Sequence, residues 1–393
     1  MSEPTGLGGK WLLIGHYGAG NTGDEAMCRA LIASSPPELR ARLVLVSKTG
    51  TGDCGAAGHL TLRPAILARA LLRVEGVILG GGTHFHDEYV GRTYVEHLGS
   101  MLRHMVVYAL TRLLGGRVIW VGVGVGPLRR SAARLLFRAA ASTCSLITVR
   151  DRASLERCRA LLSERRLRVV RPAFDLAALL PSPAPREDRS SGGIVLGVSV
   201  MNLAGFRGFG PEAAAEASDN VAAGLRKALA ADNSLHIRIF IIGQSRREDD
   251  REASSRLAGT LERAAPGRVR LVEHEPDPER TLQRFADCDA VLATRYHSLL
   301  FGYLAGCRLA ALAYNEKVAD LCEELGLGRG AVIRPEDALD REAVGASLHG
   351  LLAGDEASTP TLPLEEARAA ARRSIELLVE AAGGRGEPNP EQR

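Results

Sequence analysis

The sequence has little of several features that would place it in a special class of protein. Across 393 residues, no apolar run approaches the ~20 residues needed to span a bilayer. The formal net charge of +4 is too small to indicate nucleic acid as a partner. Residues 1–15 contain too short an apolar stretch and too few basic residues for a secretory signal. These absences predict a globular protein, and the cytoplasm is its expected location.

Cysteine and lysine are also poorly represented. The seven cysteines are scattered, odd in number and never spaced as C-x-x-C. This pattern favours reduced core residues over disulfides or a zinc site. Only four of the fifty basic residues are lysine, which indicates a compositional bias. The presence of an arginine therefore carries little functional information by itself.

Short apolar runs rich in β-branched residues alternate with longer helical patterns along most of the chain. This rhythm predicts parallel sheets covered by helices on both faces. It stops at 181–193, PSPAPREDRSSGG, and restarts with IVLGVSV at 194–200. Proline, serine, glycine and mixed charge without apolar periodicity are typical of a linker.

We therefore predict an α/β protein with two doubly wound parallel-sheet lobes, at residues 1–180 and 194–360. Residues 181–193 form the predicted linker, and 361–393 the predicted C-terminal helix and disordered tail. We expect this helix to pack back across the lobes. Ligands of such folds bind at the carboxyl ends of strands, often between lobes.

The segment GAGNTG at 18–23 formally matches the glycine pattern of a dinucleotide site. Such a site needs an acidic side chain at the end of the second strand, but LVLVSK ends in Ser47 and Lys48. Asp24 would also repel a pyrophosphate at the helix start. Nicotinamide binding is therefore not predicted, and the absence of G-K-[ST] excludes a P-loop.

Two interpretations of this loop stay open. Asn21 or Thr22 caps a helix while the glycines turn the chain. Alternatively, the glycines let the backbone approach a ligand while Asn21 and Asp24 face it. The same loop reads G-x-x-N-x-G-D-E-A over residues 18–26, which resembles the opening signature of the polysaccharide pyruvyl transferase family.

Three later segments resemble the same family, in the same order. They are GVILGGGTHFHDE at 76–88, SLITVRDRASLE at 145–156, and ATRYHSLLFGYLAGCRLAALAYNEKV at 293–318. Each is modest by itself, but four in order are specific. The resemblance runs from about residue 11 to residue 325.

The resemblance implies a fold of the glycosyltransferase B type and transfer of the pyruvyl group of phosphoenolpyruvate to a sugar. The product would be a pyruvate ketal across two hydroxyls, released with phosphate. It implies no cofactor, with phosphoenolpyruvate as co-substrate. The acceptor would be a sugar or a lipid-linked or nucleotide-linked saccharide, and a lipid link would bring peripheral membrane contact. The sequence does not give the oligomeric state, and a homo-oligomer stays open.

The chemistry requires a general acid that protonates C3 of the donor. Arg295, Tyr296 and His297 lie where the strand DAVLAT passes into a helix. The resemblance assigns His297 as the acid and Arg295 as the phosphate ligand, with Tyr296 beside them. The helix start opposes an imidazolium by ~0.5–2 kcal/mol. A donor anion at ~4 Å favours it by roughly 4 kcal/mol per charge at an effective dielectric of ~20. We therefore expect His297 to be protonated when the donor binds.

The remaining candidates follow other strand ends. Many family members carry an arginine after the first strand of the second lobe, where this chain has Met201 and Asn202. If nothing replaces that arginine, donor affinity or donor identity changes. Further donor-side candidates are Asn202, Arg207, Gln244 and Lys317.

On the acceptor side, Gly20, Asn21, Gly82 and Thr83 are candidates for binding. Asp24 or Asp87 is expected to accept a hydroxyl proton. The pattern H-x-H-D at 84–87 lacks the further histidines of a metal site, so none is predicted.

Arg150 and Asp151 are interpreted as a structural ion pair or a helix cap rather than as functional residues.

Two alternatives to the proposed activity remain open. A nucleotide-sugar-dependent glycosyltransferase with the same architecture is the nearest alternative activity. The other alternative is a non-catalytic binding protein that has kept the fold.

Overall fold

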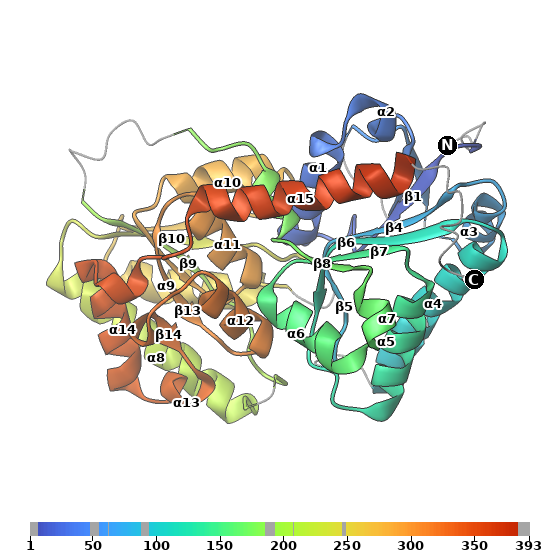
Figure 1. Cartoon of the computed structure of the whole chain (residues 1–393). Coiled ribbons are helices and arrows are strands. Elements are labelled where there is room, and N and C mark those ends of the chain that lie inside the picture. Colours follow the sequence, from blue (N-terminus) through green and yellow to red (C-terminus); the bar gives the residue numbers. More distant parts are fainter. Residues whose placement is uncertain are drawn as a thin grey trace.

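Two parallel β-sheets, one in each half of the chain, organise the fold (Figure 1). The computed structural model describes residues 7–47, 55–61, 63–87, 94–184, 193–206, 208–245 and 249–383. Both sheets are covered by helices on both faces, which confirms the prediction of two doubly wound lobes.

The first sheet has the strand order β3-β2-β1-β4-β6-β7-β8, with β5 paired to β6. Its inner strands are continuous apolar runs, because both faces of a parallel sheet are buried. The strands are β1 (Trp11–Ile14), β2 (Leu43–Ser47), β3 (Gly58–Thr61), β4 (Gly76–Gly80), β5 (Thr83–Phe85), β6 (Arg117–Val125), β7 (Leu146–Val149) and β8 (Val170–Pro172).

The second sheet has the order β11-β10-β9-β12-β13-β14. Strands β10 and β11 are added on one side of β9, whereas β12, β13 and β14 are added on its other side. This change of side creates a crevice at the carboxyl ends of β9 and β12. The strands are β9 (Val195–Ser199), β10 (His236–Phe240), β11 (Val269–Val272), β12 (Ala290–Ala293), β13 (Arg308–Leu312) and β14 (Val332–Ile333).

The first lobe buries two core layers, one on each face of its sheet. Neighbouring residues of a strand point to opposite faces, so Leu13 packs with α1 and the short turn η1, whereas Leu12 packs with α3, α4 and α5. The helices of this part are α1 (Thr22–Ser34), α2 (Pro37–Arg40), α3 (Pro64–Leu71), α4 (Tyr94–Leu113), α5 (Ser131–Thr143), α6 (Arg152–Leu161), α7 (Glu164–Leu167) and η1 (Leu176–Leu179).

The second lobe contributes the remaining helices. They are α8 (Pro211–Ala231), α9 (Arg251–Ala264), α10 (Pro278–Ala286), α11 (Tyr296–Leu304), α12 (Glu316–Glu324), η2 (Arg329–Ala331), α13 (Pro335–Ala338), α14 (Arg341–Ala353), η3 (Glu356–Ser358) and α15 (Leu364–Gly383). None of the helices in the described ranges combines the length and the apolar character needed to cross a membrane.

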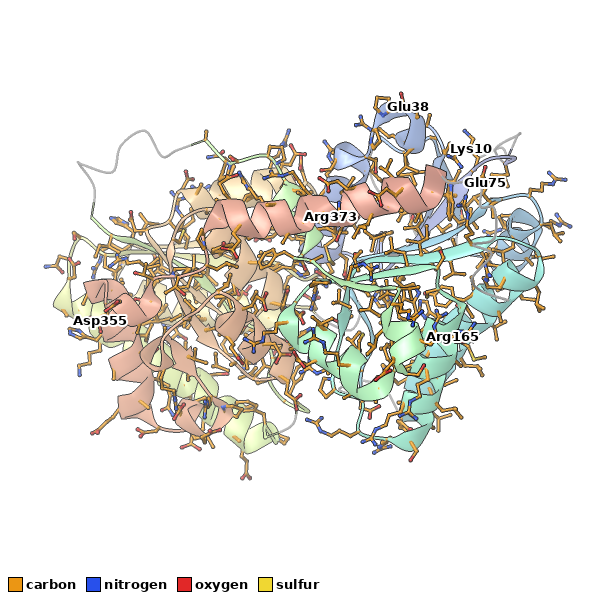
Figure 2. All side chains as sticks on the ribbon, in the orientation of Figure 1. Lys10, Glu38, Glu75, Arg165, Asp355 and Arg373 are labelled. Carbon is orange, nitrogen blue, oxygen red and sulfur yellow. The ribbon has the colours of Figure 1, made fainter. Side chains whose placement is uncertain are left out.

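Helix α15 runs from the second lobe back over the first (Figure 1). Its Ser374 hydroxyl donates to Thr148 Oγ1 at 2.9 Å. At its far end, the Arg117 guanidinium donates to the carbonyl oxygens of Ala381 and Ala382. Figure 2 shows Glu75, which pairs with Arg117, at this distal end of the first lobe. The expected packing of the last helix across both lobes is confirmed.

The cysteine prediction is confirmed for the described part of the chain. Six cysteines are buried free thiols, namely Cys28, Cys144, Cys158, Cys288, Cys307 and Cys322. Cys54 lies outside the described residues.

Candidate active site

The glycine loop after β1 meets the second lobe directly. Gln244 N donates to the carbonyl oxygen of Gly20 at 2.8 Å, and Thr22 N donates to that of Ile242 at 3.3 Å. The Thr22 hydroxyl donates to the same Ile242 oxygen at 3.0 Å. Asn21 and Gly243 thus form an antiparallel bridge between the lobes.

Asn21 is also the N-cap of α1, and its side-chain oxygen accepts from Gly23 N at 3.0 Å. The capping interpretation is therefore confirmed. Gly23 therefore lies in the first turn of α1, on the side that faces the second lobe. Only a residue without a side chain fits there, because a Cβ on Gly23 would lie 1.9 Å from His297 Nδ1.

His297 occupies the first turn of α11, immediately after β12. Its side chain is 11% exposed, and Nε2 is buried without a hydrogen-bond partner among the described residues. Asp175 Oδ2 is 3.8 Å away, too far for a hydrogen bond. Burial, followed by the charges of Arg150, Lys317 and Arg295, holds the pKa of His297 well below its usual range. The imidazole is therefore neutral in the ligand-free protein at neutral pH.

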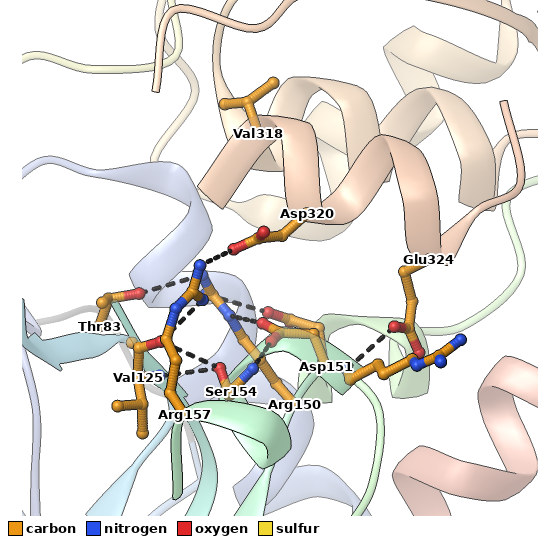
Figure 3. Close-up of polar contacts among 12 residues, drawn as sticks. Thr83, Val125, Arg150, Asp151, Ser154, Arg157, Val318, Asp320 and Glu324 are labelled. Atoms are coloured by element: carbon orange, nitrogen blue, oxygen red, sulfur yellow. Dashed lines mark hydrogen bonds and ion pairs between the residues drawn. The ribbon is translucent and has the colours of Figure 1, made fainter. Parts of the chain in front are cut away.

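Arg150 lies at the centre of the site, with Thr83, Asp151 and Ser154 around it (Figure 3). Its guanidinium donates to Thr83 Oγ1 at 3.0 Å and reaches carboxylate oxygens of Asp151 at 3.3 Å and Asp175 at 3.4 Å. The same group lies over the Tyr296 ring of the second lobe, 3.9 Å from its centroid. Although burial opposes the charge, Tyr296 and the two carboxylates raise the pKa of Arg150, so it stays cationic.

Asp151 caps α6 by accepting from Ser154 N at 2.6 Å. Ser154 Oγ in turn accepts from Val125 N at 2.8 Å, which joins α6 to the end of β6. Both structural interpretations of Arg150 and Asp151, ion pair and helix cap, are thus confirmed. These interpretations are incomplete for Arg150, because it also contacts Tyr296 across the lobe junction.

A second connection between the lobes lies beside this site, between α6 and α12. Arg157 Nη2 is 2.7 Å from Asp320 Oδ2 and 3.4 Å from Glu316 Oε2. Arg152 N donates to Glu324 Oε2 at 2.9 Å. These contacts hold the start of α6 against the helix that carries Lys317.

Arg295 is the N-cap residue of α11, but its side chain points into an ion pair. Its guanidinium is 9% exposed and donates to both oxygens of Asp250, the shortest contact being 2.6 Å. Asp250 Oδ2 also accepts from Gly243 N at 3.0 Å. Arg295 therefore supports the loop that meets the first lobe, and a donor phosphate would share the guanidinium with Asp250.

The other predicted donor residues are spread over several loops. Lys317, in the first turn of α12, lies close enough to lower the pKa of His297. Asn202 is exposed, and its side-chain oxygen accepts from Ala204 N at 2.9 Å. Gln244 joins the lobe bridge through its backbone. Arg207 lies outside the described residues.

The predicted acceptor residues lie around the second glycine turn. Gly82 adopts φ +75°, a left-handed conformation that favours glycine, and a Cβ there would lie 3.5 Å from Asp24 Oδ1. Thr83 follows and holds Arg150. Gly20 and Asn21 use their backbone for the lobe bridge. Asp24, the residue that follows Gly23, therefore faces this turn.

Asp87 has a different position from Asp24. Its Oδ2 accepts from the backbone N–H groups of Arg129 and Arg130, just before α5. These two hydrogen bonds favour a structural role for Asp87 in ordering the turn before α5.

Two buried carboxylates of the site were missed in the sequence analysis, Asp175 and Asp250. Asp175 follows β8 and stands alone in the apolar segment AFDLAALL, which is a usable signal because isolated buried carboxylates need partners. Asp250 lies in a charged run, where no pattern distinguishes it from its neighbours.

The histidines near residue 84 pack against one another. His84 stacks on His16 with 4.5 Å between ring centroids, and Nε2 of His84 donates to Gly81 O at 3.1 Å. Within the described ranges, no group of three or more histidine, cysteine or acidic side chains could hold a metal ion.

A family model described as polysaccharide pyruvyl transferase matches residues 61–316. This span includes Thr83, Arg150 and the Arg295–His297 segment, and it confirms the resemblance drawn from the sequence. Among curated proteins, none matches the chain.

Several solved structures share the fold at low identity. Anabaena Alr3699/HepE in complex with UDP and glucose is 12% identical, with a TM-score of 0.54 over 95% of this chain and 99% of that chain. S. aureus MnaA with UDP is 10% identical, with a TM-score of 0.59 over 94% of each chain. The Neisseria meningitidis UDP-GlcNAc 2-epimerase bound to UDP-GlcNAc is 10% identical, with a TM-score of 0.56 over 94% and 100%. These neighbours confirm the glycosyltransferase B type of fold.

Proposed function

Because this chain belongs to the polysaccharide pyruvyl transferase family, we propose that it transfers the pyruvyl group of phosphoenolpyruvate to two hydroxyls of a sugar. C3 of the donor gains a proton and C2 becomes an oxocarbenium-like centre. One hydroxyl adds to C2, phosphate leaves, and the second hydroxyl closes a ketal. One hydroxyl proton ends on the methyl group and the other on phosphate.

The observation that carries this proposal is that two buried polar atoms at the lobe junction, His297 Nε2 and Tyr296 Oη, have no hydrogen-bond partner among the residues that the structure describes. Buried polar atoms are normally paired, so two neighbouring exceptions between two lobes indicate a ligand position. Both lie on the first turn of α11, where strand β12 ends. Such strand ends are the usual ligand positions of this sheet type.

The charges around His297 suit a small anion. Arg150, Lys317 and Arg295 all lower the pKa of the imidazole, so they act on it as a positive field even though Asp151, Asp175 and Asp250 pair with the two arginines. A phosphate and a carboxylate entering this field offset it and raise the pKa of His297 again. We infer that His297 takes up a proton with the donor and delivers it to C3.

The acceptor would approach from the first lobe. Asp24 faces the Gly82 turn and follows Gly23, which contacts His297. We infer that the Asp24 carboxylate and the imidazole of His297 act on the same bound acceptor and donor from opposite lobes. We assign Asp24 as the group that accepts the hydroxyl proton, and Thr83 as a residue that orients the acceptor side through Arg150.

The decisive test combines product mass with phosphate release. Candidate sugar acceptors incubated with phosphoenolpyruvate should gain one pyruvyl unit as phosphate appears. His297→Ala should lower turnover by ~10²–10⁴-fold and leave the unfolding midpoint nearly unchanged. The matched control is His349→Ala, an exposed histidine on α14. Full activity of His297→Ala would disprove the acid assignment.

A parallel measurement separates this activity from a nucleotide-sugar-dependent glycosyltransferase. Phosphoenolpyruvate should raise the unfolding temperature, because a ligand that binds only the folded state stabilises it. UDP-sugars and GDP-sugars serve as comparisons. Stabilisation by a nucleotide sugar alone would overturn the proposed donor.

A further inference from the structure

Every large hydrophobic side chain that is exposed in the described part of the chain lies on one side of the first lobe. Exposed apolar residues are common singly, but a group on one surface indicates an interaction site. The eight residues are Leu72, Val95, Leu102, Val106, Leu110, Leu113, Leu114 and Leu135.

Most of these residues belong to α4, which is apolar on two opposite sides. At 3.6 residues per turn, Val95, Leu102, Val106, Leu110 and Leu113 fall within an arc of about 80°. The buried residues of α4 occupy the opposite side and pack on the sheet; they are His97, Met101, Tyr108 and Thr111. The core therefore does not require the exposed stripe.

Helices α3 and α5 extend this surface. Leu71, Met101 and Phe137, from α3, α4 and α5, share one core layer, so these helices cover the same face of the sheet. This face lies opposite α1 and α15 (Figure 1). We call the outer surface of residues 63–73, 94–114 and 131–143 the α3–α5 face.

The α3–α5 face is strongly basic. Its three segments contain one acidic residue, Glu96, and seven arginines, all of them exposed. The whole chain has nearly equal numbers, 50 basic and 46 acidic. The arginines are Arg63, Arg69, Arg73, Arg103, Arg112, Arg134 and Arg138.

We propose that the α3–α5 face docks on an anionic lipid surface, with the stripe of α4 in the boundary between headgroups and acyl chains. A helix that is apolar on its outer side and flanked by arginines is the form that interfacial helices take. Arginines near anionic headgroups add attraction. A second copy of the chain fits less well, because a symmetric contact would bring seven arginines against seven.

The docked face adjoins the candidate active site. Helices α4 and α5 begin at the edge of the sheet where β5 and β6 end, and Arg130 lies over the Tyr94 ring at 4.0 Å to tie their first residues together. Thr83 belongs to β5 and contacts Arg150. A lipid-linked acceptor held at this face would have its sugar near that edge. The docking proposal itself rests on the α3–α5 face and not on the reaction.

The test measures binding of the full chain to vesicles by co-flotation. Vesicles of phosphatidylglycerol and phosphatidylcholine should bind the protein at least ~10-fold more tightly than vesicles of phosphatidylcholine alone. Leu102→Gln/Val106→Gln/Leu110→Gln should lose at least ~10-fold of this binding. The same loss of vesicle binding is expected for the triple variant Arg69→Gln/Arg73→Gln/Arg103→Gln.

The matched control removes the same charge from the other lobe. Arg226→Gln/Arg263→Gln/Arg270→Gln changes three exposed arginines and should bind like the wild type. Circular dichroism and unfolding midpoints check that all variants fold. Absence of vesicle binding, or equal loss in the control, overturns the proposal. A wild-type dimer that the glutamine variant of α4 converts to monomer, without vesicle binding, assigns the face to a second copy instead.

Discussion

The imidazole of His297 occupies the space that a side chain on Gly23 would need. A Cβ there would lie 1.9 Å from Nδ1 and 2.1 Å from Cγ. We expect Gly23→Ala to push His297 aside and to lower turnover by ~10–100-fold, because small misplacements of a reacting group carry large rate penalties. Steady-state kinetics with an unfolding titration would measure both effects.

The control for this change is Gly345→Ala in α14, where an added Cβ meets nothing within 4 Å. It should keep full activity and stabilise the protein by about 0.5–1 kcal/mol, since alanine is the better helix former. Unchanged turnover in Gly23→Ala would show that the contact with His297 has no catalytic importance.

Arg150→Lys should separate charge from shape at the centre of the site. Lysine keeps the cation but loses the planar fork that reaches Thr83, Asp151 and Asp175 together. We expect a loss on the order of 2 kcal/mol in the free energy of unfolding and a drop in turnover. Arg159→Lys, at an exposed pair on α6, should change stability by less than ~0.5 kcal/mol. Equal effects of the two changes would contradict the central position of Arg150.

The pair of Arg295 and Asp250 should be strongly coupled. Removing one member leaves a buried charge without its partner, which costs about 3–5 kcal/mol. The double variant Arg295→Gln/Asp250→Asn should lose clearly less than the sum of the two single variants. Urea unfolding of all four proteins gives the coupling energy. Simple additivity would mean that the ion pair does not form in solution.

The stability of the first lobe should depend on pH through His84. Burial, followed by the charges of His16 and His104, lowers the pKa of His84 well below its usual range. Below about pH 6.5 the unfolded chain therefore binds a proton that the folded chain does not. The free energy of unfolding should fall as the pH falls from about 6.5 toward 5, with a slope of up to ~1.4 kcal/mol per pH unit from this residue.

His84→Gln should make this slope shallower. Unfolding titrations at about pH 8, where the imidazole is neutral in both states, measure the packing change alone and correct for it. A slope identical to that of the wild type would show that His84 is not the titrating group.

The sequence predicted the two lobes because their inner strands are continuous apolar runs. Runs such as those at 117–126 and 194–200 are recognisable since both of their faces are buried. The edge strand β8, of which two of three residues are exposed, is an example of a strand that was missed. Such strands form because a neighbour offers backbone partners, and this leaves little trace in the local pattern.

The site was predicted in part, and the difference again has a physical reason. His297 and Gly23 belong to local motifs, so the strand-to-helix junctions could be recognised. Their mutual contact could not, because they lie in different lobes. Similarly, Arg295 was expected to bind the donor, and nothing local indicated that Asp250 pairs with it. Partners across the lobe junction are a property of the tertiary fold.

The backbone bridge between Gly20–Thr22 and Ile242–Gln244 limits how the two halves can separate. A rotation that widens the junction must either break these three hydrogen bonds or use them as its axis. If they persist, the lobes separate between α6 and α12, where the Arg157–Asp320 ion pair and the Arg152–Glu324 hydrogen bond must break. Substrates would then enter between α6 and α12. Added salt would favour this opening, because it screens the Arg157–Asp320 ion pair.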